Sequence, residues 1–412
     1  MTTARPSALV LYHYLYPDQV VSSVLFTDLC IGLQRRGWTV TGSACDRGWK
    51  DESKTHPKRE TWQGVEFLRV RRPRFRQSSG FSRAANALWM IASWSLMALN
   101  PRIRPDVLIV GTDPILSLTV SLWWRLCRPG VRVAHWCFDL YPEAAVAAGL
   151  VRKDSAFTSF VQILMERSYR SCGLIVDIGS CMRSRLKSYG FKARSQTITP
   201  WALAETEQPS LADAEERERL FQGATLGLLY SGSFGRAHSC LGIADLARIL
   251  VAGGGRIVFG VQGNAAEDLR AAMKEADAPV TFAEYAEGTQ DLERRLAAAD
   301  VHIVSLHQEW TGTVVPSKFF GALAIGRPVL FIGSPDSAIA RWIEEFSVGW
   351  VVAADNVAFV AAELLAFASD SDAKAKLFEH CHRTYTQNFS KEHALDRWDH
   401  ELKSLIGGVC NA

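Results

Sequence analysis

The sequence predicts an α/β protein built from two doubly wound parallel-sheet domains in tandem, with a cleft between them. Three observations predict this architecture. Short apolar runs alternate with segments of helical periodicity along most of the chain. This alternation breaks once, between Pro200 and Gly223. The chain of 412 residues is also too long for one ordinary core, so two domains are expected.

The first series of elements lies within residues 1–199. Its apolar runs predict buried strands, and the segments between them have the periodicity of helices covering both faces of a sheet. The predicted strands are 7–14, 38–44, 65–72, 106–111, 131–136 and 173–179, and the predicted helices are 24–38, ending near Gly37, then 82–99, 115–127, 155–171 and 180–188.

A linker is predicted at residues 200–224, because this stretch is acidic, contains two prolines and lacks a strand. The charge changes sign at the same place. Residues 1–200 hold 28 Lys and Arg against 14 Asp and Glu, whereas residues 201–412 hold 18 against 29. A basic half attracts nucleic acid, anionic lipid or phosphorylated substrates, and composition alone does not choose among them.

The second series forms a domain at residues 225–390. A further helix begins near Lys391 and could pack back on the N-terminal domain as segment 391–412. The predicted strands are 226–232, 256–261, 280–285, 300–306, 327–333 and 349–354, and the predicted helices are 240–251, 265–276, 289–299, 316–325, 336–345, 356–369 and 372–388.

Composition argues against several classes of protein. The nine cysteines form no Cys-x-x-Cys or Cys/His ligand spacing, which is typical of reduced thiols in a cytoplasmic protein without a metal site. The N-terminus lacks the apolar core and cleavage site of a signal peptide. The longest apolar stretch, Ala85 to Leu99, is too short to span a bilayer comfortably.

Two loops have features that favour an anion. In "GTVVPSKFF" (312–320), Gly312 and Thr313 allow close approach of the backbone, Pro316 opens a helix and Lys318 adds a charge to its first turn. In "YSGSFGRAH" (230–238), small residues follow a strand and Arg236 stands beside Gly235. The alternatives are an ordinary helix start and a tight turn.

These residues carry a resemblance. The pieces "HYLYPD" with "LQRRGWTVTG", "FDLYPEAAVAAGL", "YSGSFGRAH", "VTFAEY", "VPSKFFGALAIGRPVLFIG" and "DSAIARWIEEFSVGWVV" resemble, in this order, the retaining glycosyltransferases of the GT-B fold, family 4 type. Among them the chain looks most like bacterial amino-sugar (fucosamine-like) transferases that assemble surface polysaccharides. The resemblance implies two Rossmann-like domains, an acceptor on the N-terminal domain and no metal or cofactor.

The resemblance also implies that the C-terminal domain holds a nucleotide-diphosphate sugar donor. Arg236 and Lys318 would neutralise its diphosphate, amides around Val314 would contact it, and Gln262 and Tyr285 would border the base. The expected donor residues are Gly232, Ser233, Gly235, Arg236, Gln262, Tyr285, Gly312, Thr313, Val314, Ser317 and Lys318.

The sequence departs from this family at two positions. Members commonly carry Glu-x7-Glu across the loop and helix, with the first carboxylate on the donor sugar and the second on the ribose. Here the two positions are Thr313 and Gly321. Stabilisation of the leaving diphosphate needs neither carboxylate. Glu309 could replace the sugar contact, or it could be solvated surface.

On the acceptor side, the candidate catalytic residues are Asp139, Glu143 and His13, with Glu309 from the donor loop. The spacing of Asp139 and Glu143 would place both on one helix face, and Asp139 would orient or deprotonate the acceptor hydroxyl. Alternatively, Asp139 caps a helix opened by Pro142, and His13 is a hydrogen-bonded histidine of a polar turn. The family commonly has His where this chain has Phe138.

Residues 68–104 place arginines beside a Trp- and Met-rich helix. This pattern suits an anionic membrane surface and a polyprenyl-linked acceptor at the inner face of the membrane. It also suits a core helix whose Trp89, Met90 and Trp94 face the sheet. The predicted activity is glycosyl transfer to a hydroxyl of a glycan, glycolipid or small molecule. The alternatives are a nucleotide-sugar-binding protein without turnover and a sugar-nucleotide epimerase.

Overall fold

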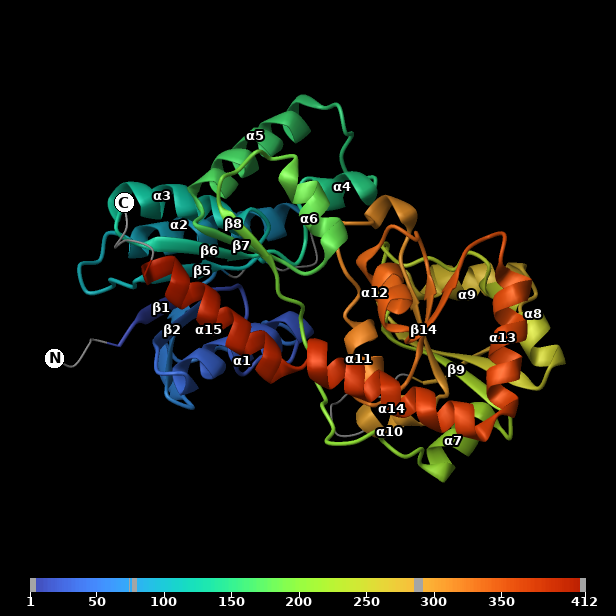
Figure 1. Cartoon of the computed structure of the whole chain (residues 1–412). Helices are drawn as coiled ribbons and strands as arrows, with labels where there is room; N and C mark the ends of the chain where they lie inside the picture. Colours follow the sequence, from blue (N-terminus) through green and yellow to red (C-terminus); the bar gives the residue numbers. More distant parts are fainter. Residues whose placement is uncertain (1–4, 74, 76–79, 285–291, 408–412) are drawn as a thin grey trace. The chain divides into compact units, whose positions relative to one another are not determined.

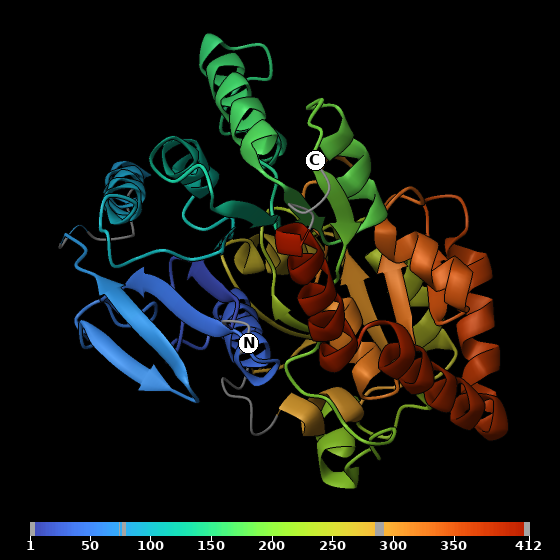
Figure 2. The same cartoon turned by 60° about the vertical axis from the view of Figure 1, so that its left-hand side comes forward.

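The computed structural model describes residues 5–73, 75, 80–284 and 292–407 (Figures 1 and 2). The chain divides into two compact units. Unit 1 comprises Met1–Thr199 and Ala394–Ala412, and unit 2 comprises Pro200–His393. Each unit has its own β-sheet, and the eight described cysteines are all free thiols.

Unit 1 is built on an eight-stranded sheet in the order β3-β4-β2-β1-β5-β6-β7-β8. Every neighbouring pair is parallel except β3 and β4. Strands β3 and β8 were not predicted, because their mostly polar, partly exposed residues lack the apolar run of a buried strand. The strands are β1 (Ser7–Leu11), β2 (Thr39–Cys45), β3 (Arg59–Trp62), β4 (Val65–Val70), β5 (Val107–Val110), β6 (Arg132–Trp136), β7 (Leu174–Asp177) and β8 (Arg194–Thr197).

Helices cover both faces of this sheet (Figure 1). On one face lie α1 (Val21–Arg35) and the C-terminal α15 (Lys391–Gly407). Leu395 of α15 fills the space beside Gly32, and Trp398 packs edge-on against Trp136 at 5.3 Å between ring centroids. The other face carries α2 (Gly80–Met97), α3 (Val120–Cys127) and α5 (Ala156–Ser171). The shorter helices are η1 (Ser117–Thr119), α4 (Glu143–Ala147) and α6 (Ser180–Lys187).

Unit 2 is built on a six-stranded parallel sheet in the order β11-β10-β9-β12-β13-β14. The chain order reverses between β9 and β12, and ligands of such sheets bind beyond the carboxyl ends of the strands at this point. The strands are β9 (Leu226–Ser233), β10 (Gly255–Gln262), β11 (Val280–Phe282), β12 (Val301–Ser305), β13 (Val329–Ile332) and β14 (Gly349–Val352).

Part of the predicted linker is helical. Helix α7 (Ala214–Phe221) begins at Asp213, whose carboxylate accepts a hydrogen bond from the Glu216 amide, and it buries Leu220 and Phe221. The acidic composition concealed this capped helix. The other helices of unit 2 are α8 (Ile243–Ala252), α9 (Ala266–Glu275), α10 (Leu292–Ala297), η2 (Gln308–Trp310), α11 (Lys318–Ala324), α12 (Ala338–Phe346), α13 (Val357–Ser369) and α14 (Ser371–Asn388).

No helix within the described ranges is long and apolar enough to cross a membrane. Within the same ranges, His, Cys, Asp and Glu side chains form no group of three or more that could hold a metal ion.

Candidate functional site

Three titratable side chains gather where strands of unit 1 end. His13, Asp113 and Asp139 follow β1, β5 and β6 by two or three residues each. These strands are parallel neighbours, so their carboxyl ends share one edge of the sheet. The His13 amide donates to the Asp113 carbonyl at 3.0 Å, and His13 Nδ1 lies 3.2 Å from Asp113 Oδ1. The fold therefore places an imidazole–carboxylate pair at this edge.

Burial and charge set the protonation of this group. Burial lowers the pKa of His13, but the charge and hydrogen bond of Asp113 outweigh it and raise that pKa to about 10. Burial and the negative charge of Asp113 raise the pKa of Asp139 to about 6. At neutral pH His13 is therefore a cation, whereas Asp139 titrates close to neutrality and is suited to proton transfer.

Glu143 does not share a helix face with Asp139. Helix α4 begins at Glu143, after a turn that places Asp139 outside the helix, so the four-residue spacing has no helical meaning here. Tyr189 instead donates its hydroxyl proton to Glu143. The alternative role of Asp139 as a helix cap is also wrong, because the N-cap residue is Pro142 and no side chain caps this helix.

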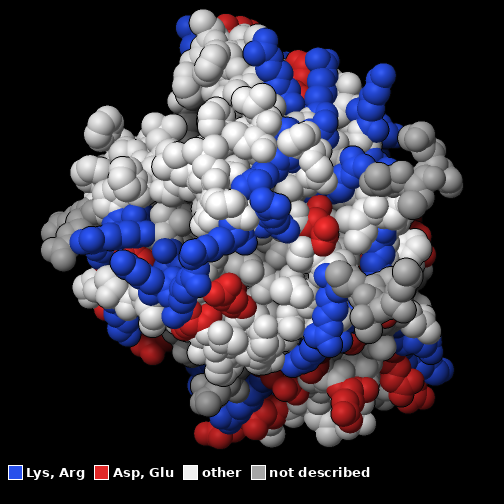
Figure 3. Space-filling model, turned by 90° about the vertical axis from the view of Figure 1, so that its left-hand side faces the viewer, with Lys and Arg blue, Asp and Glu red and all other residues white. Residues whose placement is uncertain are grey.

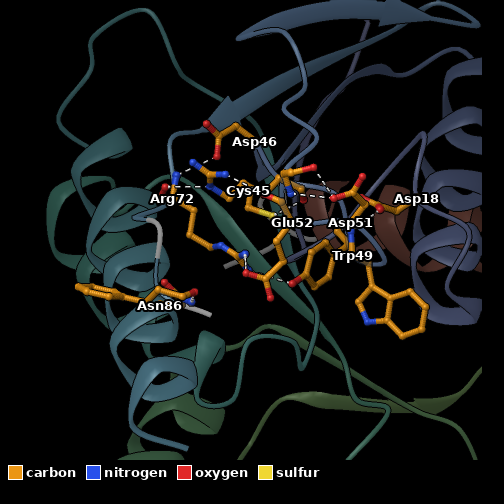
Figure 4. Close-up of polar contacts among 12 residues, drawn as sticks. Asp18, Cys45, Asp46, Trp49, Asp51, Glu52, Arg72 and Asn86 are labelled. Atoms are coloured by element: carbon orange, nitrogen blue, oxygen red, sulfur yellow. Dashed lines mark hydrogen bonds and ion pairs between the residues drawn. The ribbon is translucent and has the colours of Figure 1, made fainter. Parts of the chain in front are cut away.

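A second network stiffens the same edge (Figure 4). Arg72, which follows β4 and is fully buried, binds the loop after β2. Its amide donates to Asp46 Oδ1 at 2.9 Å, and its guanidinium donates to Glu52 Oε2 at 3.2 Å and to the Tyr14 hydroxyl at 3.0 Å. Tyr14 stacks on His13 with ring centroids 4.1 Å apart. The network thus fixes the orientation of the ring beside the titratable group.

Trp49 belongs to the same loop. Its amide donates to Asp18 Oδ1 at 2.7 Å, and its side chain is 47% exposed. Figure 4 shows the indole directed away from the polar network.

Sequence reasoning missed Asp113, Arg72 and Trp49. Asp113 could have been found, because it follows the predicted strand 106–111 at a strand end, where the other candidates lie.

The centre of the candidate donor site in unit 2 is Lys318, the first residue of α11. Its Nζ donates to the Ser233 carbonyl at 2.8 Å and lies 5.0 Å from the centroid of the Tyr230 ring. Burial lowers the pKa of Lys318 to about 8. Gly232 has φ +116°, and a Cβ there would lie 3.2 Å from Lys318 Cε. Glycine thus leaves room for the ammonium group beside β9.

The loops after β9 and β10 are bound to each other. The Phe234 amide donates to the Gln262 carbonyl at 2.6 Å, and Gly263, at φ +116°, approaches Phe234 so closely that a Cβ would lie 2.7 Å from its carbonyl oxygen. A Cβ on Gly235 would lie 3.3 Å from Asn264 Oδ1. These contacts hold Gly232, Ser233, Gly235 and Gln262 in one rigid strand-end region, from which the exposed Arg236 projects.

His238 links this region to β12. Its Nδ1 lies 2.9 Å from the Ser305 carbonyl. Burial and the charge of Lys318 lower the pKa of His238 to about 3, so the ring is neutral at physiological pH. Cationic charge from this group of side chains therefore comes from Lys318 and Arg236.

The loop from 306 to 317 departs from the sequence-based prediction. Helix α11 begins at Lys318, two residues after Pro316, because residues 316 and 317 form a tighter turn whose carbonyls accept from Phe319 and Phe320. Thr313 is buried, and its hydroxyl donates to the Trp310 carbonyl at 2.7 Å. The Thr313 side chain therefore stabilises the conformation of its own loop.

The remaining donor-side candidates occupy different surroundings. Gly312 takes φ +80°, Val314 forms a bridge with Thr311, and Ser317 precedes α11 without capping it through its side chain. Glu309 is exposed in η2. Tyr285 lies outside the described residues. A Cβ on Gly321 would meet only Leu296 Cδ1, at 4.0 Å, so this helix position has room for a side chain.

Comparisons with known proteins bear on the fold. No protein-family model matches the sequence. The chain is 27% identical over 297 residues to "Probable glycosyltransferase WbjE" of Pseudomonas aeruginosa, covering 68% of this chain and 70% of that protein.

Solved glycosyltransferase structures align along nearly the whole chain. Sucrose-phosphate synthase of Thermosynechococcus elongatus aligns with a TM-score of 0.71 at 12% identity, covering 98% of this chain and 100% of that one. HepE of Anabaena, solved with UDP and glucose, aligns with a TM-score of 0.65 at 12% identity, covering 97% of this chain and 100% of that one. The glycosyltransferase WaaG aligns with a TM-score of 0.62 at 16% identity, covering 95% of this chain and 99% of that one. The two parallel-sheet units and these alignments show that the chain has the GT-B fold of glycosyltransferases.

Proposed function

We propose that this protein is a glycosyltransferase that moves a sugar from a nucleotide diphosphate to a hydroxyl of a glycan or polyprenyl-linked acceptor, with retention at the anomeric carbon. The observation that carries the proposal is Lys318, a half-buried cation held at the strand ends of unit 2 over the Ser233 carbonyl. The relative named as a probable glycosyltransferase and the HepE structures with UDP and UDP-glucose support it.

The donor role follows from the chemistry of the leaving group. Breaking the bond between sugar and diphosphate leaves negative charge on the diphosphate, and fixed cations lower the barrier by stabilising that charge. Burial destabilises the charged form of Lys318, and a bound diphosphate would stabilise it again through its negative charge. Arg236 adds a planar, permanently charged group on the exposed side of the same loop. In this proposal the two cations act without a metal ion.

The acceptor role falls to unit 1. Asp139, with a pKa near 6, accepts the proton of the attacking hydroxyl, and the His13–Asp113 pair orients the acceptor. The exposed indole of Trp49 offers a flat surface on which a sugar ring stacks.

The proposed sugar is a hexose or an N-acetylaminosugar. Neither family carboxylate is present at 313 or 321, so contacts to the donor sugar and ribose come from other groups. Glu309 is proposed for the sugar contact, since it lies in the same loop as Thr313.

The test is turnover with defined donors. Purified protein is incubated with UDP, GDP and dTDP sugars, with and without Mg²⁺, and with membrane lipid extract as acceptor, and the released nucleotide diphosphate is measured. Lys318→Ala and Arg236→Ala should each lower kcat/KM at least tenfold, about 1.4 kcal/mol. Lys274→Ala, an exposed lysine of α9, is the matched control.

Three outcomes would contradict the proposal. Unchanged kinetics in both variants would remove the diphosphate assignment. Donor binding without any turnover would indicate a nucleotide-sugar-binding protein. Conversion of the donor sugar in the absence of acceptor would indicate an epimerase.

A further inference from the structure

Three helices of unit 1 expose large apolar side chains on one surface. Helix α3 contacts both α2 and α5, and the three lie side by side on one face of the sheet (Figures 1 and 2). Hydrogen bonds fix their arrangement: Trp124 Nε1 donates to the Trp94 carbonyl at 2.9 Å, and Ser171 Oγ donates to Ser121 Oγ at 2.6 Å. We call this outward face the α2–α3–α5 surface.

On α2 the exposed stripe is apolar although it faces solvent. Met90 and Trp94 are fully buried against the sheet. On the opposite side of the helix, Phe81 is 85% exposed, Leu88 66% and Leu96 63%. A helix that only covers a sheet carries polar residues on its outer face. The outer face of α2 is therefore suited to an apolar surrounding.

The same property continues on the neighbouring helices. Leu126 of α3 is 74% exposed. On α5, Phe157 and Phe160 are 61% and 63% exposed, and the stripe that they begin ends in Arg167 and Arg170 at helical spacing. Large apolar side chains and arginines thus share one line along α5, as in helices that lie at a membrane surface.

The charges around this surface have one dominant sign. Segments 80–104, 115–128 and 150–171, which form it, contain nine Lys and Arg but only two acidic residues, Asp154 and Glu166. Glu166 pairs with Arg170 on the same helix. The upper part of the face drawn in Figure 3 shows a wide uncharged area bordered by Lys and Arg. An anionic surface complements this distribution, whereas two-fold pairing with a second copy would bring like charges together.

We infer that the α2–α3–α5 surface binds an anionic lipid bilayer, inserting the aromatic side chains of α2 and α5 among the lipids while the arginines contact phosphate headgroups. The inference rests on the proposed function only in that a membrane-bound enzyme would meet a lipid-linked acceptor there. The binding itself requires neither donor nor turnover.

Vesicle sedimentation with the full chain tests this inference. Extruded vesicles of pure phosphatidylcholine are compared with vesicles containing about 30% phosphatidylglycerol. Wild type should bind the anionic vesicles at least tenfold more tightly than the neutral ones, and added salt should weaken this binding because it screens the exposed charges.

Two double variants separate the apolar and charged contributions. Phe157→Ser with Phe160→Ser should lose at least tenfold in affinity for anionic vesicles, since both rings leave the bilayer. Lys153→Gln with Arg167→Gln should lose about twenty-five-fold in affinity, from about fivefold for each surface charge. The matched controls in unit 2 are Phe359→Ser with Leu241→Ser and Lys274→Gln with Lys376→Gln, whose side chains are also exposed and which should bind as wild type.

Circular dichroism and Tm verify that each variant is folded. Failure of wild type to bind anionic vesicles, or wild-type binding by the folded Phe157→Ser/Phe160→Ser protein, would overturn the inference. So would light scattering that shows a wild-type dimer abolished by these substitutions without any vesicle binding, which would assign the surface to self-association. Vesicle binding with no sugar transfer would count against the proposed function alone.

Discussion

Replacement of Lys318 tests the candidate donor site at the group that defines it. Methionine keeps the unbranched stem and removes the charge, whereas arginine keeps a charge that does not titrate. The wild-type side chain should behave unusually, because burial lowers the pKa of Lys318 to about 8.

The magnitude follows from that value. About nine-tenths of Lys318 is charged at pH 7 and about one-tenth at pH 9. If the charged form alone binds the diphosphate, affinity should fall about tenfold between these pH values, or about 1.4 kcal/mol. His238, with its pKa near 3, stays neutral throughout this range. The Lys318→Arg variant should therefore bind with little dependence on pH.

Lys318→Met should weaken nucleotide binding but increase the stability of the folded protein. The folded-state pKa of Lys318 lies below its ordinary value, so the unfolded chain holds the proton more tightly and stability rises with pH between about 8 and 10.5. At pH 7 the folded protein carries the cost of a buried charge. Lys318→Met should thus raise the free energy of unfolding by about 1–3 kcal/mol while weakening nucleotide binding.

Calorimetric titration with UDP, GDP and dTDP at pH 7, 8 and 9, together with urea unfolding, measures both effects. Lys318→Met should bind at least tenfold more weakly at pH 7 and show no further loss at pH 9. Equal wild-type affinity at pH 7 and pH 9 would refute the reasoning, as would a methionine variant that binds like wild type.

Three other substitutions probe different parts of the molecule. Gly321→Glu has room beside Leu296 and should tighten nucleotide binding by up to about tenfold through a charge-assisted hydrogen bond to ribose; unchanged calorimetric affinity would contradict a ribose there. Trp398→Ala should lower the free energy of unfolding in urea by about 3–5 kcal/mol, whereas the exposed control His400→Ala should change it by less than about 0.5 kcal/mol. Asp139→Asn should lower kcat at least a hundredfold, and wild-type kcat should fall as the pH drops through about 6; a flat profile would exclude Asp139 as the base.

The fold was predictable where apolar runs are long and buried. The strands containing Leu9, Ile109 and Ile303 lie in the sheet interiors, and their sequences permit few other interpretations. The edge strands β3 and β8 were missed because an edge strand pairs on one side only, and the mostly polar residues of these two strands do not form the apolar run of a buried strand.

The candidate site was only partly predictable. The position of His13 after its strand indicated the sheet edge, but its protonation depends on Asp113, one hundred residues away in sequence. The four-residue spacing of Asp139 and Glu143 suggested that both lie on one face of a helix. The sequence did not show that a turn precedes the helix and leaves Asp139 outside it. Arg72 looked like one member of a basic run, and only folding shows it buried among loop acceptors.

The path of the chain through unit 1 affects how this protein is made. Residues up to Thr199 form most of the unit, yet α15 supplies Leu395 and Trp398 to its interior after the intervening unit 2. A ribosome therefore releases the last part of unit 1 only after it has made all of unit 2. Unit 2 emerges complete while the α1 face of the earlier sheet still lacks its cover, so the exposed Gly32 and Trp136 surface is where a nascent chain would need a chaperone. A shortened protein that stops before α15 should accordingly aggregate even though every strand of both sheets is present.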